Sequence, residues 1–332
     1  MAKGTEMAPA PIALFTYNRP DHLRRTLAAL RESALACESR LYLFSDGPKG
    51  IEDAATVEEV RRIVKHVEGF ADVIVREQST NQGLAQSVLS GVTGLVEQYG
   101  RIIVLEDDLV AAPGFLSFVN RALERYRDDP QVMQVSGYMF PVLEANRLSP
   151  TFFCRVPTSW GWGTWDRAWR CLDLDSGRML NHLSDPQVRE AFNVNGAYPY
   201  FEHLRLQHDG KLDVWGVRWY ASMFVAGGLC LYPRRSLIQN IGMDGSGVHC
   251  GRSSDFQVEL SPSRDWTYPD RIEESAEAVE AIRSFLVSLR AQKPESVIAE
   301  LPSRLRAMAG RMMRAVGLAN RSRTSGEKPC RR

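Results

Sequence analysis

The strongest constraint on the fold is an alternation of apolar runs with helix-like segments over the first 110 residues. Apolar runs within 11–18, 40–50 and 101–110 each end in a turn or a polar cluster, and amphipathic helical patterns separate them. Strands that alternate with helices of this length form a mostly parallel sheet with helices on both faces. The sequence therefore predicts an α/β, Rossmann-like fold.

Three carboxylates follow one of these runs. The segment 101–110, RIIVLEDDLV, places Glu106, Asp107 and Asp108 directly after an unbroken apolar stretch. An isolated Asp-Asp pair is typical of a solvated turn or a helix cap, but the apolar stretch indicates a central strand, and ligands bind beyond the carboxyl ends of such strands. Adjacent carboxylates favour a divalent cation, and oxygen ligands suit Mg²⁺ or Mn²⁺. This pattern predicts a site for a metal and a diphosphate.

Polar residues also follow two other predicted strands. Asn18 and Arg19 stand after the first, in YNRP, and Asp46 stands after the second, in SDGPK. The carboxyl ends of parallel strands meet at one edge of a sheet, so these residues are expected to line one cleft with the acidic triplet. The simpler interpretations are a turn former for Asp46 and a surface cation for Arg19.

Composition limits the class of protein. With 332 residues, of which 44% are hydrophobic, the chain can form one large α/β domain or two smaller ones. A net charge of +1 gives no overall attraction to nucleic acid, so none is expected as a partner. The 6 cysteines are scattered, without the spacing of a zinc site or a disulfide framework, which suggests a reducing cytoplasm. No signal-peptide core or membrane-spanning run is expected.

Five ordered motifs between residues 10 and 255 carry a family resemblance. They are LFTYNRPDHLRRTL, LFSDGPK, NQGLAQSVLSGV, IIVLEDDLVAAPGFLSFVNRAL and SWGWGTWDRAW. Together they resemble the GT-A fold nucleotide-sugar glycosyltransferases of the inverting, family-two-like kind. The EDD triplet, the NR pair and GWGTW are also similar to the N-acetylglucosaminyltransferase I type. The resemblance implies a GT-A domain at 1–270, with a nucleotide-binding half at about 10–110 and an acceptor half at about 111–270.

The resemblance also implies roles for single residues. Asp108 corresponds to the direct metal ligand, Asp107 to a residue facing ribose or sugar, and Asp46 to a contact with the base and ribose. Asn81 and Gly83 correspond to the turn that brings a helix N-terminus toward the donor, although Asn81 also suits a simple helix cap. The implied donor-binding residues are Asn18, Arg19, Asp46, Asn81, Gly83, Glu106 and Asp107.

The tryptophan-rich segment SWGWGTWDRAW predicts two kinds of environment. Trp165 and Trp169 fall in an expected helix, where core packing is the natural interpretation. Trp160 and Trp162 alternate with glycines, which let the backbone approach a ligand, and aromatic rings stack on sugar faces. By the resemblance they bind the acceptor. His249, in the loop GSGVHC, is a candidate metal or phosphate ligand, with a purely structural histidine as the alternative.

Asp213 is the candidate catalytic base. It precedes a predicted helix with Trp215, Trp219 and Met223 on one face. In the family an acidic residue at this place removes the proton from the acceptor hydroxyl. Here Val214 separates Asp213 from the tryptophan that the acid directly precedes in the family pattern. The alternative is that Asp213 only caps the helix.

The C-terminal extension, 271–332, begins with a predicted helix and continues into a basic segment. Leu301, Leu305, Met308 and Met312 recur near one helical face, with arginines around them. A basic amphipathic helix is typical of an element that binds an anionic membrane surface. A solvated or partner-packed helix followed by a disordered tail is the alternative.

The sequence therefore predicts an enzyme, a glycosyltransferase of the hexosyl or N-acetylhexosaminyl type that acts in polysaccharide biosynthesis. It would use a divalent metal, a nucleoside-diphosphate sugar with UDP-sugars first, and a glycan or glycolipid acceptor, in the cytoplasm or at the inner face of the cell membrane. One alternative is a sugar nucleotidyltransferase, which usually has a Gly-rich loop after the first strand, whereas TYNRPDHL has no glycine. The other is an inactive glycan-binding scaffold, which has no reason to keep the acidic triplet.

Overall fold

The computed structural model describes residues 8–246 and 253–292. The strands are β1 (Ile12–Thr16), β2 (Arg40–Ser45), β3 (Asp72–Glu77), β4 (Arg101–Glu106), β5 (Leu109–Ala111), β6 (Val132–Ser136), β7 (Thr151–Cys154), β8 (Trp162–Trp165), β9 (Leu229–Pro233) and β10 (Ile238–Asn240). The α-helices are α1 (Pro20–Arg31), α2 (Ile51–Val64), α3 (Leu84–Tyr99), α4 (Phe115–Arg125), α5 (Asp166–Trp169), α6 (Ser176–His182), α7 (Pro186–Phe192), α8 (Tyr200–His208), α9 (Trp215–Val225) and α10 (Ala276–Gln292). Short 3₁₀ turns lie at Ala36–Glu38 and Ala145–Arg147.

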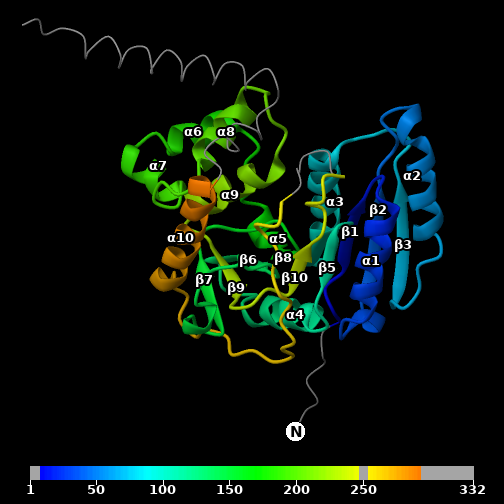
Figure 1. Cartoon of the computed structure of the whole chain (residues 1–332), viewed down its shortest axis with the longest axis horizontal. Helices are drawn as coiled ribbons and strands as arrows, with labels where there is room; N and C mark the ends of the chain where they lie inside the picture. The colour runs from blue at the N-terminus through cyan, green and yellow to red at the C-terminus, as the bar shows by residue number, and fades with distance from the viewer. Residues whose placement is uncertain (1–7, 247–252, 293–332) are drawn as a thin grey trace, which may run out of the picture. The chain divides into compact units, whose positions relative to one another are not determined.

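Eight of the strands form one sheet, in the order β3-β2-β1-β4-β8-β6-β9-β7. The first four are parallel to one another, and β6 is parallel to β9. Strands β8 and β7 run antiparallel to their neighbours. Figure 1 shows β1, β2 and β3 with α1 and α2 in blue and cyan, the N-terminal half of this arrangement. The predicted α/β fold with a mostly parallel, helix-flanked sheet is confirmed.

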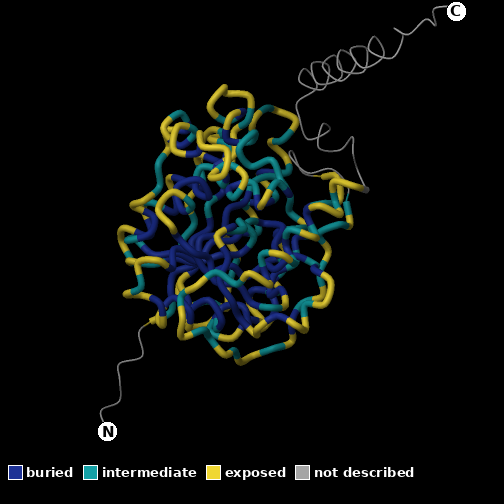
Figure 2. The backbone as a smooth tube through the Cα atoms, turned by 90° about the vertical axis from the view of Figure 1, so that its left-hand side faces the viewer, coloured by how far each residue is buried: buried dark blue, intermediate teal, exposed yellow. Residues whose placement is uncertain are grey.

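The sequence accounts for the burial of the parallel strands. All five residues of β1, and the middle of β4 from Ile102 to Leu105, are buried, because helices pack on a parallel sheet and leave its strands little contact with water. Helix α3 contacts β1 and β4, and α4 contacts β6 and β8. Figure 2 shows the buried backbone in dark blue at the centre, with exposed segments around it.

A short β-ribbon joins the two halves of the sequence beside the sheet. Strand β5 comes directly after the acidic triplet and pairs antiparallel with β10, so that Leu109 lies opposite Asn240. The backbone N–H of Ile241 donates to the carbonyl oxygen of Asp108. Residues far along the chain are thereby held next to the end of β4.

Two expectations about helices are wrong. Helix α9 begins at Trp215 with Val214 as its N-cap, and no side chain caps it, so Asp213 is not the helix cap. Helix α3 begins at Leu84 with Gly83 as its N-cap, so Asn81 is not a cap either. In both cases the polar residue stands before the helix boundary, and the side chain of Asn81 is bonded elsewhere.

The tryptophan segment also differs in part from the expectation. Trp165 lies in β8 rather than in a helix, and Trp169 ends the short helix α5. Both are buried, as the core-packing interpretation requires.

Contacts between residues divide the chain into two units, Met1–Phe285 and Leu286–Arg332. Of the second unit, the structure describes only residues 286–292, at the end of α10. The basic segment with Leu301 and Met312 lies outside the described residues. No helix among the described residues combines the length and the apolar character needed to cross a membrane.

Candidate active site

A cleft of about 160 Å³ lies at the carboxyl ends of β1, β2 and β4, beside the start of α3. The lining includes all eight of the residues that the sequence assigned to donor or metal binding in this part of the chain. They are Asn18, Arg19, Asp46, Asn81, Gly83, Glu106, Asp107 and Asp108. Their roles toward a ligand remain predictions, but their arrangement around one cleft is a property of the fold.

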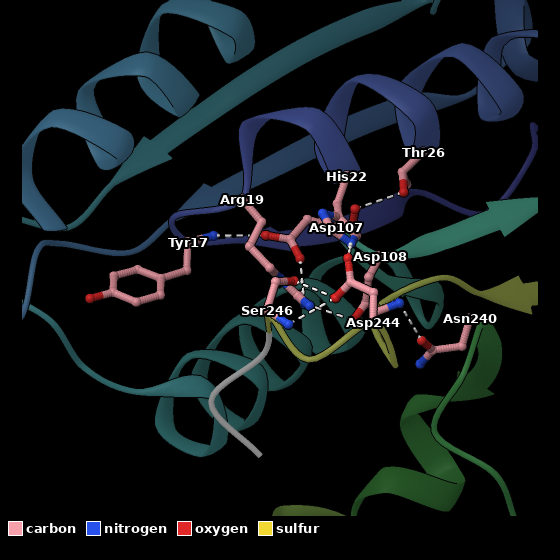
Figure 3. A network of polar contacts seen from close by, with 10 residues as sticks. Tyr17, Arg19, His22, Thr26, Asp107, Asp108, Asn240, Asp244 and Ser246 are labelled. Carbon is pink, nitrogen blue, oxygen red and sulfur yellow. Dashed lines mark hydrogen bonds and ion pairs between the residues drawn. The ribbon is translucent and has the colours of Figure 1, made fainter. Parts of the chain in front are cut away.

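Arg19 holds the two aspartates of the acidic triplet together. Its Nη2 lies 3.0 Å from Oδ1 of Asp107 and 2.7 Å from Oδ2 of Asp108. The other oxygen of Asp107 accepts from the backbone N–H of Tyr17 at 3.1 Å, and the Thr26 hydroxyl donates to the Asp107 carbonyl at 2.8 Å. Figure 3 shows Arg19 reaching toward both carboxylates. The turn after β1 is thereby fixed to the turn after β4.

Burial determines the charge state of this cluster. Burial, followed by repulsion from Asp108 and Asp107, raises the pKa of Glu106 to about 8. Burial also raises the pKa of Asp107, against the opposing effect of Arg19. Burial disfavours the charged form of Arg19, but the two aspartates outweigh it and raise the pKa of the guanidinium. Without a further cation, the site favours a proton on Glu106 near neutral pH.

One oxygen of the cluster lacks a protein partner. Oδ1 of Asp108 is buried and accepts no hydrogen bond from the described residues. Such an acceptor suits a hard cation or a ligand donor, so the residues present fit the predicted divalent metal. The described residues contain no group of three His, Cys, Asp or Glu side chains already placed around a metal position, so Glu106 and Asp108 would have to be joined by ligand or water oxygens.

The chain that follows β10 packs closely on Asp108. A Cβ added to Gly242 would lie 2.0 Å from Oδ2 of Asp108 and 2.7 Å from Nη1 of Arg19. Only glycine allows the backbone to come this close without displacing the Arg19–Asp108 pair. Sequence reasoning did not identify Gly242, since its role depends on the pairing of β5 with β10.

A second contact fastens the same loop. Nε2 of His22, on α1, lies 3.2 Å from Oδ2 of Asp244. The Ser246 hydroxyl and backbone N–H both donate to Asp244, and these bonds lower its pKa to about 2. Figure 3 shows His22, Asp244 and Ser246 beside the aspartates. The predicted ligand His249 is outside the described residues.

Asp46 joins the turn after β2 to the start of α3. Its carboxylate accepts four hydrogen bonds, from the backbone N–H groups of Gly47, Gln82 and Gly83 and from the side-chain amide of Asn81. The Asn81 amide also donates to the carbonyl of Gly47 at 2.9 Å. In this structure Asp46 and Asn81 therefore shape the wall of the cleft by bonding to each other.

Asn18 and Tyr17 connect the turn after β1 to α2. The Asn18 amide donates to Oδ1 of Asp53 at 3.2 Å, and the Tyr17 hydroxyl donates to Oδ2 of Asp53 at 2.5 Å. Burial and the bond to Asp53 raise the pKa of Tyr17 to about 12. Lys49 also lines the cleft, with its Nζ 6.0 Å from the centre of the Tyr17 ring.

The floor of the cleft is apolar and carries two hydroxyls without partners. The rings of Phe15 and Phe44 stack with centroids 4.8 Å apart, and both line the cleft together with Leu84. The hydroxyls of Thr16 and Ser87 are buried and have no hydrogen-bond partner among the described residues. This combination suits a flat ring with polar edge groups.

A sequence signal for this floor existed but was missed. Strand β1 ends in Leu-Phe-Thr and β2 in Leu-Phe-Ser, and these triplets pair in register, Phe15 opposite Phe44. The repeat of the same triplet before two adjacent turns predicts two neighbouring rings at the sheet edge.

The prediction that Trp162 binds an acceptor is wrong. Trp162 is 0% exposed, and its ring stacks on Trp215 at 5.4 Å and lies 5.8 Å from Trp169. It belongs to the core between β8 and α9. Trp160 is half-buried, with Tyr138 and Phe256 against its ring, and its acceptor role stays a prediction.

Asp213 does not line the cleft. Its side chain is 71% exposed, and its Oδ1 lies 3.8 Å from Nη2 of Arg218. Of the other carboxylates in this part of the chain, Glu202 and Asp209 are paired with Arg205. The role of Asp213 as a base stays a prediction.

Comparison with known proteins gives no family assignment. No family model matches the chain, and no curated protein does. Among solved structures, it is similar to a mannosyltransferase, PcManGT from Pyrobaculum calidifontis in complex with GDP-Man and Mn²⁺, at 13% identity and a TM-score of 0.36, over 67% of this chain and 77% of that one. It is also similar to S. aureus TarS, at 11% identity and a TM-score of 0.27, over 38% of this chain and 21% of TarS. The chain thus spans about a fifth of TarS.

Proposed function

We propose that this protein is a glycosyltransferase that transfers a sugar from a nucleoside-diphosphate donor to a hydroxyl group of a glycan or glycolipid. The observation that carries the proposal is the composition of the cleft, in which an acidic cluster with one arginine lies next to an apolar floor. A nucleoside diphosphate combines a flat base with a charged diphosphate, and the two parts of the cleft match these two chemistries.

The apolar floor is the proposed base site. Phe15, Phe44 and Leu84 would contact the faces of the base, and the unpartnered hydroxyls of Thr16 and Ser87 would bond to its edge. A UDP-sugar remains the preferred donor, in keeping with the family resemblance. Asp46 would act by positioning the wall, because its oxygens already accept four protein hydrogen bonds.

The acidic end of β4 is the proposed diphosphate site. Asp108 and Glu106 would hold a divalent cation, Mn²⁺ or Mg²⁺, which when bound would supply positive charge against the leaving diphosphate. Arg19 stays protonated at any physiological pH and lies beside the same aspartates, so it would donate to a diphosphate oxygen while keeping Asp107 and Asp108 in place. The exposed Lys49 would add charge at the edge of the cleft.

The proposed transfer is inverting. Asp213 would accept the proton of the acceptor hydroxyl while the hydroxyl oxygen attacks the anomeric carbon of the donor sugar. The bond from that carbon to the diphosphate breaks in the same step. The chemistry requires only moderate basicity from a carboxylate within hydrogen-bond reach of the acceptor hydroxyl. Asp244 is less suitable as a base, because the bonds from Ser246 lower its pKa to about 2.

A thermal-shift panel of nucleoside diphosphates and nucleotide sugars, with and without Mn²⁺, tests the proposal. A ligand that binds only the folded state raises Tm by mass action. At a ligand concentration of a hundred times the Kd, the free energy of unfolding increases by about 2.7 kcal/mol. We expect UDP or its sugars to give the largest shift, and only with the metal. A panel in which no nucleotide changes Tm would refute the proposal.

A further inference from the structure

A second cavity, of about 450 Å³, lies away from the residues of the acidic cleft. It is formed by three segments that are distant in the sequence: the residue before β7, the end of β9 with the two residues after it, and 261–267. The lining residues are Pro150, Pro233, Arg234, Arg235, Ser261, Pro262, Ser263, Asp265, Trp266 and Thr267. None of them lines the acidic cleft.

Two adjacent arginines place positive charge in the lining of this cavity, and neither is paired with a carboxylate within the described residues. Nη1 of Arg234 donates to the carbonyl oxygens of Asn146 and Leu148, at 3.3 and 3.0 Å. Nη2 of Arg235 donates to the side-chain oxygen of Asn146 at 3.1 Å. All of these acceptors are neutral, and within residues 8–246 and 253–292 neither arginine forms an ion pair. Asp265, the acid in the lining, is paired with Arg121 at 2.9 Å.

The walls of the cavity are held in place by the rest of the fold. The backbone N–H of Ser261 donates to the carbonyl of Ser236 at 2.8 Å. The Thr151 hydroxyl donates to the carbonyl of Thr267 at 2.6 Å. The Trp266 ring packs edge-on against Phe118, with centroids 5.1 Å apart. A site with fixed walls loses little conformational entropy when a ligand binds.

We propose that this cavity is a second binding site, for the oxyanion of a phosphate group or of an acidic saccharide. Guanidinium groups match carboxylate and phosphate oxygens with paired N–H donors, and several N–H groups of Arg234 and Arg235 form no hydrogen bond within residues 8–246 and 253–292. The half-buried Trp266 adds apolar surface beside them, suited to the face of a sugar ring. The proposal is independent of what the acidic cleft binds.

Isothermal titration calorimetry on the full chain at low salt tests this. The probes are inorganic phosphate and tetragalacturonate, with neutral maltotetraose for comparison. The variants are Arg235→Glu and Arg235→Gln; because Arg235 is exposed, both should keep the Tm of the wild type. The matched control is Arg25→Glu, an exposed arginine of α1 that lines neither cavity.

We expect at least one anionic probe to bind the wild type more tightly than maltotetraose. Arg235→Glu should weaken that binding at least about tenfold and Arg235→Gln by several-fold, because a charge-assisted hydrogen bond is lost, while Arg25→Glu changes it less than about twofold. The probe that binds more tightly identifies phosphate or acidic saccharide as the source. The proposal is overturned if neither anion binds, or if Arg25→Glu and Arg235→Glu weaken binding equally.

Discussion

At the scale of single residues, the pKa of Glu106 is raised far enough to change the charge of this side chain near neutral pH. Its pKa in the folded protein, about 8, lies well above the value near 4.5 of an exposed glutamate. Between pH 4.5 and about pH 8, the folded state therefore keeps the carboxyl proton of Glu106, whereas the unfolded state has released it. Stability contributed by this group is full below about pH 4.5 and is lost as the pH rises toward 8.

We therefore expect Glu106→Gln to flatten the pH dependence of stability in metal-free protein. Urea unfolding in EDTA, from pH 5 to pH 8, should show the wild type losing free energy of unfolding relative to the variant, by at most about 1.4 kcal/mol per pH unit. Asp107 shifts in the same direction but is present in both proteins. A difference between the two proteins that does not vary with pH would show that Glu106 is ionised in the folded state.

Substitution of Asp213 distinguishes a catalytic role of this residue from a structural one. Its side chain is 71% exposed and does not cap α9, so Asp213→Asn should leave Tm unchanged. If Asp213 is the base, sugar transfer should fall roughly 10²- to 10⁴-fold while donor affinity stays the same. Transfer at the wild-type rate would remove Asp213 from the mechanism, and a loss of donor affinity would assign it to the nucleotide pocket instead.

At the scale of elements, the loop after β10 depends on Gly242. In Gly242→Ala the added Cβ would overlap Oδ2 of Asp108, so the loop or the Arg19–Asp108 pair must move. We expect a loss of about 1 to 3 kcal/mol in urea unfolding, together with weaker nucleotide binding.

The matched control is Gly94→Ala, in the interior of α3. Outside the adjacent helix backbone, no atom of the described residues lies within 4 Å of its added Cβ, and alanine favours the helix, so this variant should gain about 0.5 to 1 kcal/mol. If both variants gave the same change in stability, close packing at Gly242 would not be the cause.

The aromatic cluster between β8 and α9 predicts losses of stability of different size for two nearby tryptophans. Trp162 is fully buried against Trp169 and Trp215, so Trp162→Ala should cost about 3 to 5 kcal/mol. Trp160→Ala, at a half-buried ring, should cost clearly less in the same denaturation experiment. A stable Trp162→Ala protein that had lost only transfer activity would restore the acceptor role for Trp162.

At the scale of the whole molecule, the alternation of strands and helices was sufficient to predict the architecture. Residues placed after parallel strands must gather at one edge, and for that reason Arg19, Asp46 and the acidic triplet could be assigned to one cleft from sequence. Trp165 and Trp169 were expected to pack in the core as helix residues, and both are buried, although Trp165 lies in β8.

What could not be predicted depends on contacts between distant segments. The Arg19–Asp107 pair spans 88 residues, and Gly242 reaches Asp108 only because β10 pairs with β5. Trp162 was misassigned because glycines on both sides suggested a loop, whereas Gly163 pairs with Ile103 inside the sheet. Local sequence patterns predict the helices and strands well, but they do not predict which side chains come into contact in the tertiary structure.

The most direct test of the central claim, that the cleft binds a nucleoside diphosphate with a divalent metal through Asp108, is calorimetric titration of UDP with and without Mn²⁺. Wild-type protein should bind UDP at least about tenfold more tightly when Mn²⁺ is present, and Asp108→Asn should lose that dependence while retaining its fold, because the change removes a metal-facing charge at a strand end. Equal, Mn²⁺-dependent affinity in both proteins would contradict the account.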